Sequence, residues 1–520
     1  MLKKLKKIDF VCIFIIISYM LILFTYKDSL LANTDNIFLV NRAEQMLNCL
    51  KDGNIPFFYY DDFNGIGYGS SFFYGQLTLY PFLLLLHFGK LPFLYSYIFV
   101  CLILNIICIK CFTKRFCTNY KFVSNLYLMS ISFFMLFTYT QLFACLMGQG
   151  LGFLFLAYLI DFLRDNKNML PSGILFFLVL NTHLLTALVV FLIAIYIGLL
   201  YFDKKRIKEY VLYFLYVLSL CLYFICNYIY HSEAINDIQA INRFSLNKGI
   251  IKQFGYTTPI GLLESSLFTR ILRGNTLFDI GTFIILIYLI IKNYNKYNKK
   301  EKLTIISCII LIIFSLNPIW TWFNLNIYTL SFQFPLRYVP FLLVYLYIIV
   351  FKNCNKELEI FLKSYTLFLF IILIIMYQIS EKPNTSEYIK LDKYVGNGEY
   401  VSKDFKYNIK DLLNTKVYDN NGIEYKYKEE KGKITIDINS SNTKEITIPK
   451  LYYKGYKVKM NGKELKILSK ITNFIKVKVK GSGKLEVYYE QPIWLQLLDL
   501  ICLLELICII RRLICKKNKK

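Results

Sequence analysis

The chain has 520 residues, 56% of them hydrophobic and 18% aromatic, and its mean hydropathy is +0.44. This apolar share exceeds the roughly 45–50% of an average soluble chain, which excludes a purely cytoplasmic globular protein and an intrinsically disordered one. The net charge of +26 would suggest nucleic-acid binding only if the basic residues were gathered in one domain.

The apolar segments predict a polytopic membrane protein. Residues 1–7 are basic, and the apolar run 8–25 lacks a cleavage site behind it, which predicts a signal-anchor helix. Asn181-Thr182-His183 interrupts the stretch 170–202, which predicts two half-length helices that meet at the outer face. Further segments near the length of a span, about 20 residues, lie at 92–112, 121–140, 142–163, 208–230, 278–293, 303–317, 335–351, 359–379 and 494–511.

The basic clusters give the orientation. If residues 170–202 cross twice, every cluster falls in the cytoplasm together with both termini, as the positive-inside rule requires. The clusters are Lys110–Arg115, Arg164–Lys167, Lys204–Lys208, Lys292–Lys302, Lys352–Lys356 and Arg511–Lys520. We therefore expect about 12 spans, and much of the positive charge records topology, so nucleic acid is not an expected partner.

Three segments are then left outside the cytoplasm: 26–91, 231–277 and 380–493. In the first, an apolar patch at 76–88 is broken by a proline, which fits an interfacial or re-entrant hairpin better than a span. The organisation expected is a multi-span domain over 1–379, a β-rich domain over 380–493 and a final span with a basic tail over 494–520.

The segment 380–493 alternates Lys and Glu with Ile, Val and Tyr, which predicts strands with one buried face. Asn461-Gly462 is a strong signal for a two-residue hairpin, and Gly481-Ser482-Gly483 predicts a second turn. We expect a small extracytoplasmic antiparallel β-domain of the sandwich type. None of the 14 cysteines lies in this segment, and their spacing gives neither a disulfide framework nor a zinc site.

The first outside segment holds the main candidate for chemistry. Thr34 suits a helix N-cap and Gly53 a helix end, so this stretch predicts one short helix. Asp35 and Arg42, seven residues apart, would share a face of it. Because the helix dipole favours an ionised acid in the first turn, Asp35 is a candidate general base; a purely structural role is the alternative.

Other candidates would bind substrate. The stretch 59–75, rich in Gly and aromatics, contains Asp61, Asp62 and Tyr74 and suits a sugar, or else an ordered loop at the membrane interface. His183 lies inside an apolar stretch and is either functional or a satisfied core histidine. Arg337 suits a lipid phosphate or snorkels to headgroups, and Arg243, Arg270 and Arg273 add positive charge to the second outside segment.

Several features in order along the chain resemble the bacterial YfhO-like membrane proteins, also labelled 6-pyruvoyl-tetrahydropterin-synthase-related. They are the multi-span frame, the Asp35 and Arg42 pair, the Gly- and Tyr-rich stretch running into LTLYPFLLL, the Asn-Thr-His break, FQFPLR, and the terminal LYYKGYKVKMNGKE and KLEVYYEQPIW. Related sequences often have His four residues after the Asp, where this chain has Leu39, which argues against a metal or a second acid-base group there. The His-rich zinc spacing that pterin chemistry needs is absent from the sequence.

These proteins are similar to the type C (GT-C) glycosyltransferases, and the resemblance implies an inverting enzyme in the bacterial plasma membrane. Asp35 would be the base, with Arg42 beside it, and Arg337 would meet the phosphate of a polyprenyl-phosphate sugar donor. The acceptor would be a cell-envelope polymer or glycolipid. No cofactor is implied, and a divalent cation is compatible but has no support in the sequence. The alternatives are a lipid or glycan transporter or flippase, and a scaffold that binds wall polymer.

Overall fold

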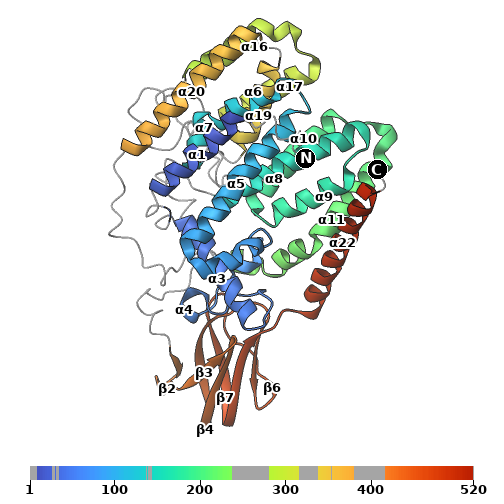
Figure 1. The fold of residues 1–520 in the computed structure, drawn as a ribbon. Coiled ribbons are helices and arrows are strands. Elements are labelled where there is room, and N and C mark those ends of the chain that lie inside the picture. The colour runs from blue at the N-terminus through green and yellow to red at the C-terminus, as the bar shows by residue number, and fades with distance from the viewer. Residues whose placement is uncertain are drawn as a thin grey trace. The chain divides into compact units, whose positions relative to one another are not determined.

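The structure, a computed structural model, describes residues 9–25, 30, 34–135, 137–138, 143–236, 280–314, 338–352, 354–379 and 416–518. The chain forms two compact units (Figure 1). The helical unit comprises residues 1–36, 91–214 and 244–387, and the mixed unit comprises residues 37–90, 215–243 and 388–520. Each unit is assembled from segments that are far apart in the sequence.

The helical unit is built from apolar helices. Figure 1 shows α8, α9 and α10 packed beside one another, and α17 packs on α19. The described helices of this unit are α1 (Phe10–Thr25), α5 (Lys90–Thr113), α6 (Tyr120–Leu128), α7 (Ile131–Met135), α8 (Phe143–Asp165), α9 (Met169–Leu180), α10 (Leu184–Leu200), η5 (Lys204–Arg206), α16 (Ile280–Asn293), η7 (Tyr294–Lys296), α17 (Lys299–Phe314), α19 (Val339–Phe351) and α20 (Lys356–Ile379). Helix α11 (Ile207–Tyr230) begins in this unit and ends in the mixed one.

Within the described residues, five helices are long and apolar enough to cross a membrane, which indicates a membrane protein. They are Lys90–Thr113, Phe143–Asp165, Lys204–Tyr230, Lys356–Ile375 and Ile493–Cys515. The predicted break in 170–202 is confirmed, because α9 ends at Leu180 and α10 begins at Leu184. Neither half is as long as the roughly 20 residues of a full span.

The predicted span 121–140 is not one continuous helix. Helix α6 ends at Leu128 and α7 begins at Ile131. Ser130 explains the break, because its side-chain Oγ accepts a hydrogen bond from the backbone N–H of Phe133 at 3.4 Å and so caps the second helix. Hydropathy shows only that this stretch is apolar, so it could not predict the cap at Ser130 that divides the helix.

The mixed unit combines the first predicted outside segment with the C-terminal sheet. Helix α3 (Thr34–Lys51) begins in the helical unit and continues in the mixed one. The other helical elements of the mixed unit are α4 (Asp62–Gly65), η2 (Gly69–Phe72), η3 (Tyr80–Phe88), α12 (Glu233–Asn236) and α22 (Ile493–Asn518). The apolar patch predicted as an interfacial hairpin is the short 3₁₀ helix η3. Helix α22 lies along the second half of α11, where Ser219 donates a 2.8 Å hydrogen bond to Glu505 (Figure 1).

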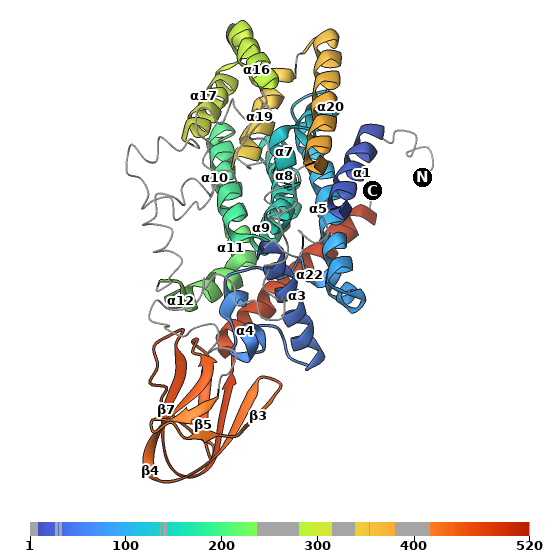
Figure 2. The same cartoon turned by 90° about the vertical axis from the view of Figure 1, so that its left-hand side faces the viewer.

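The described strands form one antiparallel sheet in the order β2-β1-β4-β7-β5-β6, with β3 also paired to β4. They are β1 (Val417–Asp419), β2 (Glu424–Tyr425), β3 (Tyr427–Glu430), β4 (Lys433–Leu451), β5 (Tyr456–Met460), β6 (Lys463–Glu464) and β7 (Phe474–Tyr489). A sandwich of two packed sheets was predicted, and within the described residues the strands form a single sheet with two long, curved central strands (Figure 2). Alternation predicts one buried face but does not say what covers it.

The two turn signals have opposite outcomes. Asn461 and Gly462 form the hairpin between β5 and β6, and both have positive φ, +48° and +82°, as a type I′ turn requires. The turn predicted at Gly481-Ser482-Gly483 is wrong, because β7 runs through these residues paired with β4. A Cβ on Gly483 would lie 2.2 Å from the Asn461 side chain, so this glycine permits a close approach and not a turn.

Candidate functional site

Asp35 lies in the first turn of the predicted helix. Helix α3 begins at Thr34 and ends at Lys51, and Gly53 follows it with φ of +77°, as the sequence led us to expect. The Asp35 side chain is exposed. A carboxylate at this position meets the positive end of the helix dipole, which favours its ionised form. The local structure is therefore compatible with a proton acceptor that solvent and substrate can reach.

Arg42 lies two turns further along the same helix and is buried, with 2% of its surface exposed. Its guanidinium donates a 2.7 Å hydrogen bond to the carbonyl oxygen of Gly75. The guanidinium carbon also lies 5.0 Å from the centre of the Tyr74 ring and 5.5 Å from that of Phe38. Among the described residues no carboxylate pairs with Arg42, and its buried Nε–H has no acceptor. It is thus a desolvated cation held by dipoles and aromatic rings.

Tyr59 connects this arginine to a second predicted residue. Its side chain is fully buried, and the hydroxyl has no hydrogen-bond partner within the described part of the chain. Burial raises the pKa of Tyr59, Arg42 lowers it by a smaller amount, and Asp62 raises it slightly. The structure therefore brings Arg42 and Asp62 close to Tyr59, which was not among the residues predicted from the sequence, and Tyr74 lies against Arg42.

Most aromatic rings of the Gly-rich stretch belong to the core of the mixed unit. Phe58, which directly precedes this stretch, stacks on Phe72 and on Tyr489, with ring centroids 5.6 and 4.8 Å apart, and it also contacts Tyr453 and Tyr456. These side chains are buried, so they pack the loop onto the sheet and offer no open platform for a sugar ring.

Asp61 is the exposed member of the predicted acidic pair, and it lies near the buried Lys450 of β4. The ammonium of Lys450 donates to the carbonyl of Tyr60 at 3.1 Å, to that of Gly65, and to the Glu429 carboxylate at 2.5 Å. Burial raises the pKa of Asp61, and Lys450 opposes that rise. Burial lowers the pKa of Lys450, and Glu429 opposes that fall. This cluster connects the first predicted outside segment to the sheet.

His183 has a local structural task. It is buried, and its Nδ1 accepts the backbone N–H of Thr186 at 3.2 Å, which makes it the N-cap of α10. Its Nδ1 also lies 2.8 Å from the Thr186 hydroxyl oxygen. A nitrogen that accepts an N–H carries no proton itself, so the neutral ring holds its proton on Nε2. His183 thus stabilises the break that separates α9 from α10.

Two carboxylates in α22 were not among the residues predicted from the sequence. Asp499 and Glu505 lie within the apolar segment Ile493–Cys515, and Glu505 accepts the hydrogen bond from Ser219 of α11. The signal was present in the sequence, since an ionisable residue inside a candidate span is a functional hypothesis by default.

The remaining predicted residues, Arg243, Arg270, Arg273 and Arg337, lie outside the described residues. Within the described ranges, no three His, Cys, Asp or Glu side chains are grouped so that they would hold a metal ion. Comparisons with protein-family models, with curated proteins and with solved structures found no match to this chain.

Proposed function

We propose that the chain is an integral-membrane glycosyltransferase, resembling the YfhO-like proteins and the type C glycosyltransferases. It would transfer one sugar from a polyprenyl-phosphate donor to a cell-envelope acceptor on the outer face of the bacterial plasma membrane. The five apolar helices support a membrane enzyme. The alternation of basic clusters with apolar segments supports about 12 spans with both termini in the cytoplasm.

The observation that carries this proposal is the exposed Asp35 in the first turn of α3. In the proposed reaction its carboxylate accepts the proton of the acceptor hydroxyl, whose oxygen forms a bond to the anomeric carbon of the sugar. The bond from that carbon to the donor phosphate breaks, and the polyprenyl phosphate leaves with the electron pair. Because phosphate is a good leaving group, a single carboxylate suffices as the acid-base group. Because the reaction is one direct displacement, the configuration of the anomeric carbon is inverted.

Positive charge would orient the donor and stabilise the departing phosphate. Arg337 and Arg243 are proposed for this task from their place in the sequence. Arg42 is buried, and its guanidinium has no carboxylate partner among the described residues, so its positive charge is not compensated. We assign Arg42 a positioning role, in which it keeps the Gly75 carbonyl and the Tyr74 ring in place.

The proposal is tested in cells by replacing Asp35. Asp35→Asn, expressed at wild-type level and correctly inserted, should abolish the glycan product and leave the lipid-linked sugar to accumulate. The control variant Asp437→Asn makes the same change at an exposed position on β4 and should behave like the wild type. Unchanged envelope glycans in Asp35→Asn would contradict the role of the base.

Orientation is tested by labelling with a thiol probe that cannot cross membranes. Lys463→Cys, an exposed residue beside the β5–β6 turn, should be labelled in intact cells above the level of the parent chain. Lys205→Cys, an exposed residue in a predicted cytoplasmic cluster, should be labelled only after lysis. The reverse result would place Asp35 on the wrong side for a donor in the outer leaflet.

The two carboxylates of α22 favour a lipid or glycan transporter as the second candidate. Carriers use ionisable residues inside spans as ion or proton sites. A transporter predicts that Glu505→Gln and Asp499→Asn abolish lipid-linked substrate flipping in proteoliposomes while Asp35→Asn does not. The glycosyltransferase predicts the opposite dependence, with transfer lost only in Asp35→Asn.

A further inference from the structure

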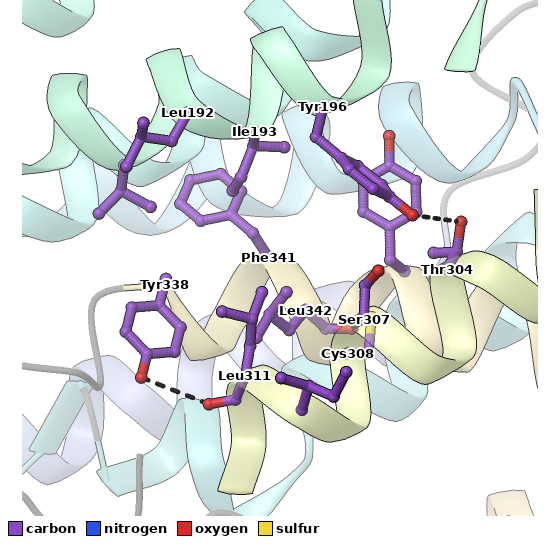
Figure 3. Close-up of a pocket in the computed structure, with 13 residues that line it drawn as sticks. Leu192, Ile193, Tyr196, Thr304, Ser307, Cys308, Leu311, Tyr338, Phe341 and Leu342 are labelled. Carbon is purple, nitrogen blue, oxygen red and sulfur yellow. Dashed lines mark hydrogen bonds between the residues drawn. The ribbon is translucent and has the colours of Figure 1, made fainter. Parts of the chain in front are cut away.

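The helical unit contains a cavity of about 520 Å³ between α10, α17 and α19 (Figure 3). This volume is typical of pockets for small organic ligands, which span about 300–1,000 Å³. Its wall is mainly aliphatic and aromatic and includes Leu192, Leu311 and Phe341. Leu192 and Leu311 are 43% and 40% exposed, so the cavity opens on the surface of these helices. An apolar molecule could therefore enter from the side.

One end of the cavity is polar. There the Tyr196 hydroxyl donates a 3.2 Å hydrogen bond to Thr304, which lies one helical turn from Lys300 (Figure 3). The hydroxyl oxygen of Tyr345, also on the wall, is buried without a hydrogen-bond partner in the described part of the chain. The wall of α17 continues to Leu311, about 10 Å along the helix axis from Thr304. The cavity is thus a short apolar channel with the hydroxyls of Tyr196 and Thr304 at one end, while at the other end the Tyr338 hydroxyl donates to the Leu311 carbonyl oxygen (Figure 3).

Two cations lie beside that polar end. The guanidinium carbon of Arg164 and the ammonium of Lys300 lie 4.8 and 4.5 Å from the centre of the Tyr201 ring. Arg164 also donates a hydrogen bond to the Tyr201 hydroxyl. The ring of Phe116 joins this pair to the cavity, since its centre is 5.2 Å from Arg164 and 5.6 Å from the ring of Tyr345. These two positive charges repel one another, and an anion bound between them would offset that repulsion.

One nearby carboxylate, that of Asp203, caps η5 by accepting the backbone N–H of Lys205 at 3.0 Å. Four others on the same and adjoining segments are paired with other cations. They form the pairs Asp161–Arg115, Asp165–Lys167, Glu209–Arg206 and Glu301–Lys352. Among the described residues, neither Arg164 nor Lys300 has a carboxylate within ion-pair distance. Both side chains are exposed, so their charge is available to a bound anion.

We propose that this is a binding site for an anionic glycerophospholipid of the cytoplasmic leaflet. One acyl chain would fill the cavity, and the phosphate would lie between Arg164, Lys300 and the Tyr201 hydroxyl. A glycerophospholipid offers a long apolar chain joined to a phosphate, which is the combination that the cavity and the two cations require. Both cations belong to clusters predicted to be cytoplasmic, where basic pockets between helices bind anionic headgroups. The site is independent of the proposed sugar transfer.

Lipid exchange on the purified full-length chain tests this proposal. The chain is placed in nanodiscs of phosphatidylcholine with or without phosphatidylglycerol, released into detergent, and its retained lipids are counted by native mass spectrometry. Phosphatidylglycerol should be retained over phosphatidylcholine by on the order of tenfold, and Arg164→Gln with Lys300→Gln should remove that preference. The control double variant, Lys167→Gln with Lys299→Gln, loses the same amount of charge next to the site and should keep the preference for phosphatidylglycerol. Equal retention of the two lipids, or a preference that survives the first double variant, would overturn the proposal.

A second arm separates a lipid from a free phosphate. Ser307→Phe fills the cavity and should lower phosphatidylglycerol retention, and inorganic phosphate should not displace the lipid. A photoreactive group at the end of the acyl chain should label the segments 304–311 and 338–345 in the wild-type chain. This measurement needs no variant, so it does not depend on how a variant folds. Displacement by inorganic phosphate would assign the cations to a soluble anion. Labelling confined to other segments would contradict the placement of the acyl chain in the cavity. Either result would contradict the lipid site.

Discussion

The imidazole of His231 stacks on the ring of Phe72, with the ring centroids 3.6 Å apart and the planes 6° from parallel. His231 directly follows α11, is 2% exposed, and holds its Nε2 3.4 Å from the hydroxyl oxygen of Tyr489 on β7. This contact joins the Gly-rich loop, the end of a candidate span and the last strand of the sheet. It packs the Gly-rich loop against the end of α11 and the sheet.

Acid should destabilise the mixed unit through this histidine. Burial lowers the pKa of His231 to about 3, and Lys454 adds to the effect. Below the ordinary histidine pKa of about 6.5 the unfolded chain takes up a proton that the folded chain does not, so stability falls as pH drops from about 6.5 toward 3. The slope approaches about 1.4 kcal/mol per pH unit. Thermal unfolding of the purified chain between pH 7 and 5 measures it.

A pair of variants isolates the contribution of His231. His231→Phe keeps an aromatic ring on Phe72 but does not titrate, so its unfolding midpoint should depend less on pH between 6.5 and 5. His87→Phe replaces an exposed histidine of η3 and should keep the wild-type slope. Equal slopes for His231→Phe and the wild type would show that this imidazole is not the source of the acid sensitivity.

Lys450 should stabilise the contact between the loop and the sheet. Lys450→Met keeps the length of the side chain but leaves the carbonyls of Tyr60 and Gly65 and the Glu429 carboxylate without their donor. We expect a loss of about 2–4 kcal/mol, because buried polar groups would lose their partners. Hydrogen exchange should increase in residues 59–66. Lys480→Met, an exposed residue of β7, serves as the control, and protection that is unchanged in Lys450→Met would contradict this account.

Arg42 should matter more for activity than for stability. Arg42→Met removes one hydrogen bond and two cation–π contacts, but it also removes the cost of burying an uncompensated charge. We expect the free energy of unfolding to change by less than about 1 kcal/mol, while the proposed sugar transfer falls strongly. A large loss of stability in Arg42→Met with unchanged activity per folded molecule would assign this residue a purely structural role.

Local signals in the sequence predicted local structure well. The helix from Thr34, the break at Asn181-Thr182-His183 and the Asn461-Gly462 turn depend on residues close together in the chain, and the structure confirms each. Gly481 and Gly483 misled because a glycine permits a turn and also a close approach between paired strands. Only the pairing partner, about 40 residues away on β4, separates the two outcomes.

The role of the Gly-rich loop depends on contacts that no local pattern contains. Phe58 and Lys450 are almost 400 residues apart in the sequence, yet both serve to pack this loop on the sheet. The second half of β4 consequently has side chains buried on both faces, and its alternation is lost from residue 446 onward. The position of the candidate base Asp35 could be predicted from the signal for the start of a helix, whereas the contacts of Arg42 with Gly75 and Tyr74 could not.

The central claim is tested most directly by sugar transfer with the purified chain in lipid nanodiscs. With a polyprenyl-phosphate sugar and an envelope acceptor, the wild-type chain and Asp437→Asn should form product at equal rates. Asp35→Asn should be slower by about 10²–10⁴-fold, which is the usual contribution of a general base. Transfer by Asp35→Asn at the wild-type rate, in protein with unchanged thermal unfolding, would contradict the account.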